Sequence, residues 1–237
     1  MKKRLFAMLL IAVLVLTGCS SRRETVEGRV EAPRNTEAQK ETKAPAETEN
    51  PLSLGRMEGG SYVNEYVGFG CDLDESWVFY SAEELQQMPE MVKEAVSGSE
   101  LGDALDAMNQ FTDVMAENVD AMVNFNVLYQ KLSAQERLAN AILTEEEMVD
   151  GILDLQDQMA DAYAQAGILV ETMEKKEVFF CGEKRFAILT SSTIEGVPYY
   201  TLQFFNHNLG SHSVTLTLAS YFENNTDDML DLFYEVD

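Results

Sequence analysis

The chain has 237 residues, of which 41 are acidic and 17 are basic, so its net charge is −24 at pH 7. A protein this acidic repels nucleic-acid phosphates and anionic headgroups, and the composition therefore excludes nucleic acid as a partner. The length leaves room for one domain with a hydrophobic core once a leader and a linker are removed.

The chain begins like an exported protein. Lys2, Lys3 and Arg4 precede an apolar run, Leu5–Leu16, which is the pattern of a secretory signal peptide. A permanent membrane span needs about 20 apolar residues, and this run is too short. We expect the run to be removed from the mature protein.

The apolar run ends in Leu16-Thr17-Gly18-Cys19, which resembles a bacterial lipobox. Gly18 leaves the neighbouring thiol accessible, and Cys19 offers the nucleophilic sulfur for a diacylglyceryl group. The resemblance implies cleavage between Gly18 and Cys19 and a lipid anchor on Cys19. It also predicts a location on the extracytoplasmic face of the bacterial cell membrane.

A tether is predicted between the anchor and the domain. Residues 19–58 are rich in Glu, Thr, Ala and Lys, with few large apolar residues and with prolines at 33, 45 and 51. Such a segment buries too little surface to offset its ordering entropy, so it should be disordered. The predicted organisation is a signal peptide (1–18), a tether (19–58) and one folded domain (59–237).

The first half of the domain mixes strands and helices. Tyr62–Leu73 predicts a strand bent at Gly68 and Gly70, and Trp77–Tyr80 a second short strand. Ser81 and Glu84 form a capping-box pattern that should start a helix ending near Gly98. Further on, we expect a short helix to about Gln110 and then a hairpin across Asn118–Asp120. Its second strand is Val123–Tyr129, where alternating asparagines predict a half-buried strand.

The second half is dominated by strands. Thr144 and Glu147 form another capping box, and the helix that follows should end at Gly167. A meander of antiparallel strands is then predicted, and a last helix from Asp227 to about Val236. The predicted strands of the meander are Ile168–Phe180, Lys184–Ile194, Val197–Phe205 and His212–Phe222. This order of elements predicts the α+β class, with a mainly antiparallel sheet flanked by helices.

Several short motifs resemble those of small clostridial-type lipoproteins with a PsbP-like domain. They are G-F-G-x-x-L-x-x-x-W at Gly68–Trp77, N-x-N-V at Asn124–Val127, F-F-x-G at Phe179–Gly182 and the pair Tyr199-Tyr200. The resemblance covers about residues 60–237, and a proline expected just before the tryptophan is absent. It implies an α/β/α sandwich and a non-enzymatic binding or assembly module, with no catalytic residues to transfer and no cofactor.

Cys71 and Cys181 remain after lipidation of Cys19. An extracytoplasmic compartment permits a disulfide between them, although sequence alone does not place their Cα atoms within bonding reach. Both lie in apolar, strand-like surroundings, where buried reduced cysteines are common. We therefore predict two free thiols, with the disulfide as the alternative.

Three groups of charged or ligating side chains are candidates for a binding site. The first is an acidic helix face. Calcium needs converging oxygen ligands, whereas a straight helix points its carboxylates outward, so we expect this face to be solvated. The second is the histidine pair His207 and His212, for which a polar loop is simpler than a metal site. The third is a group of basic side chains. We expect them to form ion pairs with Glu171, Glu174, Glu177 and Glu183 rather than a site for an anionic ligand or a protein partner. The acidic face is Glu146, Asp150, Asp154, Asp157 and Asp161, and the basic group is Lys175, Lys176, Lys184 and Arg185.

The leading hypothesis is a lipid-anchored binding or scaffold module that docks another protein of the envelope. A solute-binding lipoprotein is the alternative, and a pocket with convergent polar groups would favour it. A cell-envelope hydrolase is the least favoured, because the chain carries no G-x-S-x-G, H-E-x-x-H or P-loop motif. No catalytic residue and no metal ligand is predicted.

Overall fold

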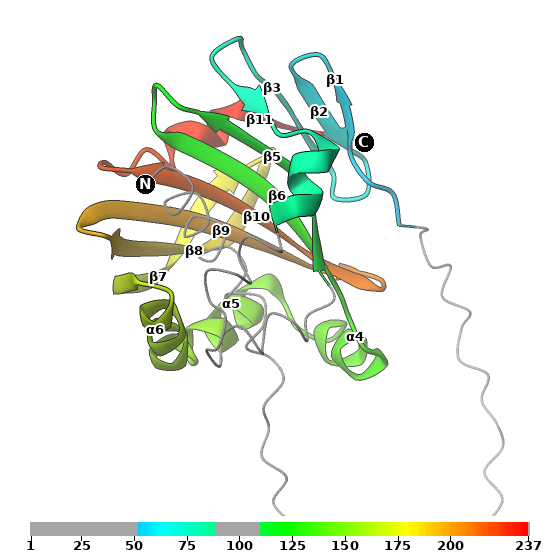
Figure 1. Ribbon diagram of the computed structural model, residues 1–237. Helices are drawn as coiled ribbons and strands as arrows, with labels where there is room; N and C mark the ends of the chain where they lie inside the picture. Colours follow the sequence, from blue (N-terminus) through cyan, green and yellow to red (C-terminus); the bar gives the residue numbers. More distant parts are fainter. Residues whose placement is uncertain (1–51, 89–109, 237) are drawn as a thin grey trace, which may run out of the picture.

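The computed structural model describes residues 52–88 and 110–236, and these residues form two antiparallel sheets and a layer of helices (Figure 1). The large sheet has the strand order β4-β5-β6-β10-β9-β8-β7, and the small sheet has the order β1-β2-β3-β11. The small sheet consists of β1 (Arg56–Glu58), β2 (Ser61–Asn64), β3 (Phe69–Asp72) and β11 (Phe233–Glu235). The large sheet consists of β4 (Val78–Phe79), β5 (Gln110–Asn118), β6 (Val123–Lys131), β7 (Ile168–Phe180), β8 (Glu183–Ile194), β9 (Val197–Leu209) and β10 (His212–Tyr221).

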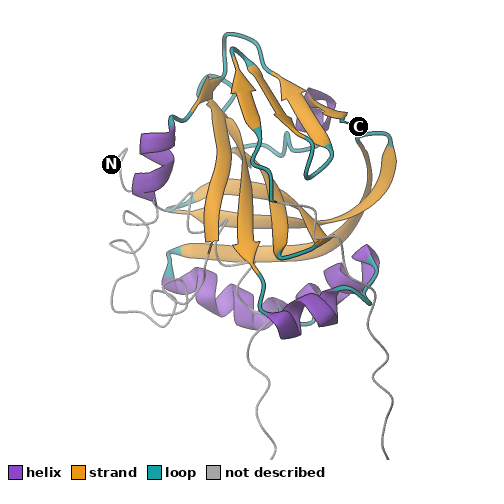
Figure 2. Cartoon of the chain, turned by 90° about the vertical axis from the view of Figure 1, so that its right-hand side faces the viewer, coloured by secondary structure: helices purple, strands orange, loops and turns teal. Residues whose placement is uncertain are grey.

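The two faces of the large sheet are covered differently. Figure 2 shows the small sheet against one face and a row of helices along the other, whereas the short helix near the C-terminus lies beside the small sheet. The helices are residues 82–88, α4 (Ala134–Asn140), α5 (Glu145–Leu153) and α6 (Gln156–Gln165), with a 3-10 helix η2 (Asp228–Leu232) near the end of the chain. The predicted α+β class, with antiparallel sheets flanked by helices, is therefore confirmed. None of the described helices is long and apolar enough to cross a membrane.

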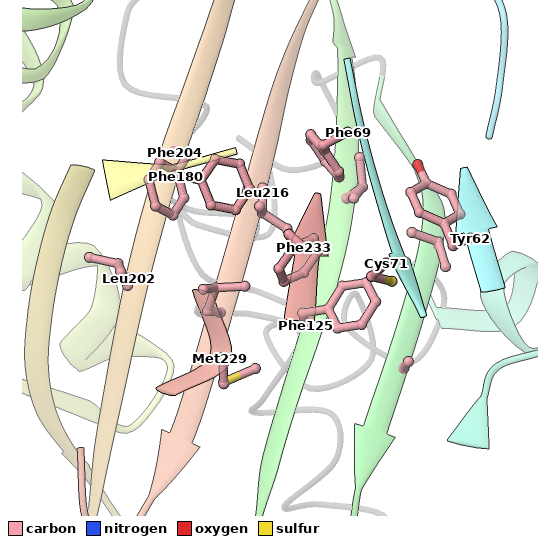
Figure 3. Packing of buried hydrophobic residues seen from close by; sticks show 14 of the residues in the cluster. Tyr62, Phe69, Cys71, Phe125, Phe180, Leu202, Phe204, Leu216, Met229 and Phe233 are labelled. Carbon is pink, nitrogen blue, oxygen red and sulfur yellow. The ribbon is translucent and has the colours of Figure 1, made fainter. Parts of the chain in front are cut away.

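The larger hydrophobic core lies between the two sheets. Phe233 of β11 sits at its centre, with ring centroids 5.8 Å from Phe69 and 5.1 Å from Phe125 (Figure 3). Phe180 and Phe204 stack beside them with centroids 4.6 Å apart. These rings come from β3, β6, β7, β9 and β11, so the core joins the two sheets into one body.

A second core lies between the large sheet and the helices. Met159 and Tyr163 of α6 pack with Tyr199, Ala219 and Tyr221 of the sheet. A smaller cluster joins Val149 of α5 to Ile188 of β8 and Phe205 of β9. Both sides of the large sheet are thus covered, and its central strands have no solvated face.

Strand β6 shows this double burial most clearly. Val123, Phe125, Val127 and Tyr129 face the small sheet, as the alternating pattern predicts. Asn124 and Asn126 face the helices and are each only 3% exposed. The prediction of a half-buried strand was therefore wrong, because the asparagines are covered as well.

Two capping boxes start helices as the sequence predicts. The Ser81 hydroxyl accepts the N–H of Glu84 at 3.3 Å, while Glu84 accepts the N–H of Ser81 at 2.8 Å. Thr144 and Glu147 form the same reciprocal pair at the start of α5. A third box, Ser133 with Glu136, begins α4, which the prediction missed. Residues 89–109, where the first predicted helix should end, lie outside the described residues.

The single helix predicted from Thr144 to Gly167 is divided into α5 and α6. Asp154 caps α5, and the N–H of Leu155 bonds the carbonyl of Ile152, only three residues back. This tighter turn starts α6 in a new direction. As a result, Val149 of α5 and Met159 of α6 each reach a different part of the sheet.

The segment predicted as one bent strand, Tyr62–Leu73, is a hairpin of β2 and β3. The Asn64 side-chain oxygen accepts the N–H groups of Tyr66 and Val67, which reverses the chain after β2. Gly68 then takes a positive φ of 79°, which glycine adopts without strain. The local side-chain bond to Asn64 therefore produces a turn that strand propensity alone does not reveal.

Three further assignments from the sequence differ from the structure: the last helix, one loop and the end of the tether. The last helix, predicted from Asp227 to Val236, is the short η2 followed by β11, which pairs with β3. The predicted loop Asn206–Ser211 is shorter, because β9 continues to Leu209 and β10 starts at His212. Residues 56–58, which the sequence assigns to the tether, form β1.

Candidate functional site

A surface groove of about 460 Å³ lies beside the shortest strand of the large sheet. It is bordered by the β1–β2 turn, the link from β3 to β4, and β4 itself. Its lining residues are Gly59, Gly60, Leu73, Asp74, Glu75, Trp77, Val78 and Phe79. β4 ends the strand order of the large sheet, so the groove lies where that edge meets the β1–β2 turn of the small sheet.

Trp77, the single tryptophan of the chain, is held in the groove by a local turn. Asp74 accepts the N–H of Ser76 at 2.9 Å through its carboxylate and the N–H of Trp77 at 3.2 Å through its carbonyl. Asn118 donates to the Ser76 hydroxyl at 2.7 Å, which ties this turn to β5. The indole then packs on Phe125, with centroids 5.9 Å apart.

The groove combines an apolar wall with an acidic rim. Trp77, Leu73 and Phe79 supply the apolar surface, and Val78 remains 58% exposed. Hydrogen bonds from Ser76 lower the pKa of the Asp74 carboxyl, so this rim group is ionised at neutral pH. Such a surface suits an apolar side chain that is accompanied by a neutral or positive group.

The sequence did not single out this groove. Gly59 and Gly60 are separated along the chain from Val78 and Phe79, and only the pairing of the small sheet brings them together. The available signal was the lone tryptophan at the end of the Gly68–Trp77 motif. An aromatic residue that a fold leaves partly exposed is a common feature of binding surfaces.

The cysteine residues are not part of the groove lining. Cys19, with the rest of the predicted lipobox, lies outside the described residues. Cys71 of β3 is buried and Cys181 is partly exposed, and both are free thiols in the structure. Burial raises the pKa of Cys71 to about 12 and that of Cys181 to about 11, so neither is a reactive thiolate at neutral pH.

The acidic helix face is divided between two helices and part of it is paired. Glu146 and Asp150 of α5 both bind the Lys175 ammonium group, at 2.9 and 2.7 Å. Asp154 is the C-cap of α5, whereas Asp157 and Asp161 belong to α6. Within residues 52–88 and 110–236, no cluster of three or more His, Cys, Asp or Glu side chains is placed to hold a metal ion.

All four residues of the basic group form ion pairs. Lys184 pairs with Glu177 at 2.6 Å, one of the partners that the sequence suggested. The other three reach carboxylates that are distant in the chain. These pairs are Lys175 with Glu146 and Asp150, Lys176 with Asp227, and Arg185 with Glu145.

His212 lies in an aromatic environment. It is 8% exposed, its ring meets those of Phe111 and Tyr129 edge-on, and its Nδ1 lies 2.9 Å from the Ser211 hydroxyl. Burial, together with the nearby charge of Lys131, lowers its pKa. The side chain of His207, its predicted companion, lies outside the described residues.

One polar network was missed by the sequence analysis. The Asp113 carboxylate accepts the Tyr62 hydroxyl at 2.7 Å, the Asn64 amide at 2.9 Å and the N–H of Gly55 at 2.9 Å. A shift of register in β5 at this residue frees Asp113 from the regular pairing with β6. The network links the small sheet to the large one, and no sequence pattern indicated the bulge that makes it possible.

Comparisons with known proteins find matches among solved structures only. No protein-family model matches the chain, and no curated protein matches it. The chain is similar in structure to the solution structure of cyanobacterial PsbP (CyanoP) from Synechocystis sp. PCC 6803, with a TM-score of 0.41 and 11% identity. The match covers 78% of this chain and 94% of that one. The fold class stated above rests on the sheets and helices of this chain.

Proposed function

We propose that the chain is a lipid-anchored extracytoplasmic binding module that has no enzymatic activity. The lipobox supports an anchor at Cys19, and the composition of residues 19–58 supports a tether. The domain would then be held at the membrane surface, where its partner is another envelope protein.

The observation that carries the docking proposal is the groove at Trp77. It combines an aromatic side chain fixed by the Asp74 turn, an exposed Val78 and an ionised rim. Aromatic side chains in partly apolar grooves are common anchors of protein interfaces. The net charge of −24 disfavours an acidic partner, so we propose a partner segment that offers an apolar side chain beside a lysine or arginine.

The anchor is tested by Cys19→Ser. Two acyl chains supply the membrane affinity, at about 0.8 kcal/mol for each buried CH₂ group, and the acidic domain supplies none. The variant should leave the membrane fraction and accumulate as uncleaved precursor. Continued detergent-dependent fractionation of the variant would contradict the anchor.

Docking is tested with the full chain as bait in solubilised membranes. Val78→Asp places a charge in the groove, whereas Val119→Asp places it on an equally exposed valine in the β5–β6 turn. Wild type and Val119→Asp should recover the same protein in near-stoichiometric amount, and Val78→Asp should lose at least nine-tenths of it. Equal recovery by all three proteins would place the docking surface elsewhere.

A further inference from the structure

One edge strand of the two described sheets differs from the others. The large sheet ends in β4 and β7, and the small sheet ends in β1 and β11. Proteins commonly protect edge strands with charged residues, because an uncharged edge pairs readily with other chains. Among the described edges, β7 carries the charged run Glu174–Glu177, β1 contains an arginine and a glutamate, and β11 contains a glutamate. Strand β4 contains only Val78 and Phe79, so it is the described edge without a charge.

The backbone of β4 has hydrogen-bonding groups that point away from the large sheet. The N–H of Tyr80 donates to the carbonyl of Met115, the residue opposite it on β5, at 3.0 Å. In an antiparallel pair, such hydrogen-bonded residues alternate with residues whose N–H and C=O groups point outward. Phe79 precedes Tyr80 and is opposite Ala116, so its N–H and C=O groups point to the open edge. Neither group forms a hydrogen bond with any part of the chain that the structure describes.

The open edge of β4 borders the groove at Trp77. Trp77, Val78 and Phe79 all line this groove, and each of them is at least partly exposed. Trp77 and Phe79 lie on the face of the large sheet that packs against the small sheet, and Val78 lies on the opposite face. A strand added beside β4 would place alternate side chains on the face of Phe79, where the groove offers about 460 Å³.

We propose that the partner docks as a short extended segment that pairs antiparallel with the outer edge of β4. This inference rests on the docking function proposed above and specifies its binding mode. All strand pairs of the two described sheets are antiparallel, and an antiparallel segment exchanges two main-chain hydrogen bonds with Phe79. Because β4 is so short, the remaining affinity comes from side chains in the groove.

The pairing also defines the sequence of the segment. The residue opposite Phe79 shares its face and is therefore apolar, and the next residue but one lies beside Trp77 and is apolar as well. In an antiparallel segment the chain then continues toward the link from β3 to β4. A lysine or arginine there meets the ionised Asp74 at the rim of the groove. The partner segment thus alternates, with its apolar residues followed by a basic one.

The test uses the full chain, purified in detergent, and the synthetic peptide acetyl-Lys-Thr-Val-Thr-Val-Thr-Lys-amide. In the proposed pairing both valines turn their N–H groups toward β4, whereas the threonines turn theirs away. One variant peptide is N-methylated on both valines, and its matched control is N-methylated on the first two threonines. Trp77 is the single tryptophan of the chain and lines the groove, so its fluorescence reports binding at this place.

The unmodified peptide should produce a saturable change in the Trp77 emission. Methylation of the valines should weaken binding at least tenfold, and methylation of the threonines should leave it within threefold. At saturation with the unmodified peptide, hydrogen exchange of the Phe79 amide should slow at least threefold, because that N–H gains an acceptor.

Equal binding of the two methylated peptides would overturn the strand pairing, because it would show that only side chains hold the segment in the groove. No saturable change in emission up to about 1 mM peptide would overturn it as well. Neither result decides whether an envelope protein docks at the groove. That question is answered separately by the recovery of a membrane protein with wild type, Val78→Asp and Val119→Asp.

Discussion

At the scale of single residues, the groove depends on a glycine that tolerates no side chain. Gly60 accepts the N–H of Leu73 at 2.8 Å through its carbonyl, so the β1–β2 turn lies close against the end of β3. A Cβ atom added to Gly60 would lie 2.5 Å from the carbonyl oxygen of Leu73. That oxygen belongs to the backbone and has little freedom to move.

We therefore expect Gly60→Ala to lower the free energy of unfolding by about 1–3 kcal/mol, the usual cost of overpacking. Gly151→Ala is the control, because nothing lies within 4 Å of its added Cβ and it belongs to helix α5. There alanine should raise stability by about 0.5–1 kcal/mol, since it favours the helix. Urea denaturation of both variants checks the pair, and a neutral Gly60→Ala would contradict this close packing.

His212 gives the chain a pH-dependent stability. Its pKa is lower in the folded protein than the ordinary value of 6.5, so the unfolded chain binds the extra proton more readily. Stability should therefore fall as the pH drops from about 7 to 5.5. The carboxyls with lowered pKa, Asp74, Glu84 and Glu147, titrate below this window.

The check is the urea midpoint of wild type and His212→Gln at several pH values. The variant should be less stable at pH 7, because it loses its ring contacts, but its midpoint should change less with pH between 7 and 5.5. Identical slopes for the two proteins would show that His212 does not carry this dependence.

At the scale of elements, helix α5 is fixed to the sheet by its first residue. The Glu145 carboxylate accepts hydrogen bonds from the Nε–H of Arg185 at 2.7 Å and from the backbone N–H of Phe186 at 3.0 Å. The side chains of Glu145 and Arg185 are each 19% exposed. The next residue, Glu146, pairs with Lys175 but is 51% exposed.

Glu145→Ala should lower the free energy of unfolding by about 1–3 kcal/mol, because it removes the carboxylate that pairs with a partly buried guanidinium and leaves the N–H of Phe186 without this acceptor. Glu146→Ala should change it by less than about 0.5 kcal/mol, as expected for an exposed ion pair. Thermal or urea unfolding compares the two variants. Similar losses for both would mean that the first turn of α5 is not the point of attachment.

Elements were predictable where their signal was local. The meander from Ile168 onward follows from period-two strands separated by turn residues, and the helix starts at Ser81 and Thr144 follow from their capping boxes. The sequence could not indicate β11, because this segment is a strand only through its pairing with β3, where Phe233 lies opposite Cys71, a residue far away in the chain. The break between α5 and α6 was likewise not predictable, because it depends on contacts of the two helices with separate parts of the sheet.

At the scale of the whole molecule, one large sheet separates two interiors of different character. The side facing the small sheet is apolar and aromatic, whereas the side facing the helices contains buried asparagine, glutamine and threonine. The α+β class could be predicted from the order of elements. The groove could not, because it assembles residues from separate segments, and the Gly68–Trp77 motif marks only the tryptophan among them.

The central claim is that the groove at Trp77 docks another envelope protein, and site-specific photocrosslinking in intact membranes tests it most directly. A benzophenone amino acid at position 78 should form one discrete crosslinked product with a second protein. The same residue at position 119, where the native valine is equally exposed, should not form that product. The absence of a product from position 78, or the same product from both positions, would contradict the claim.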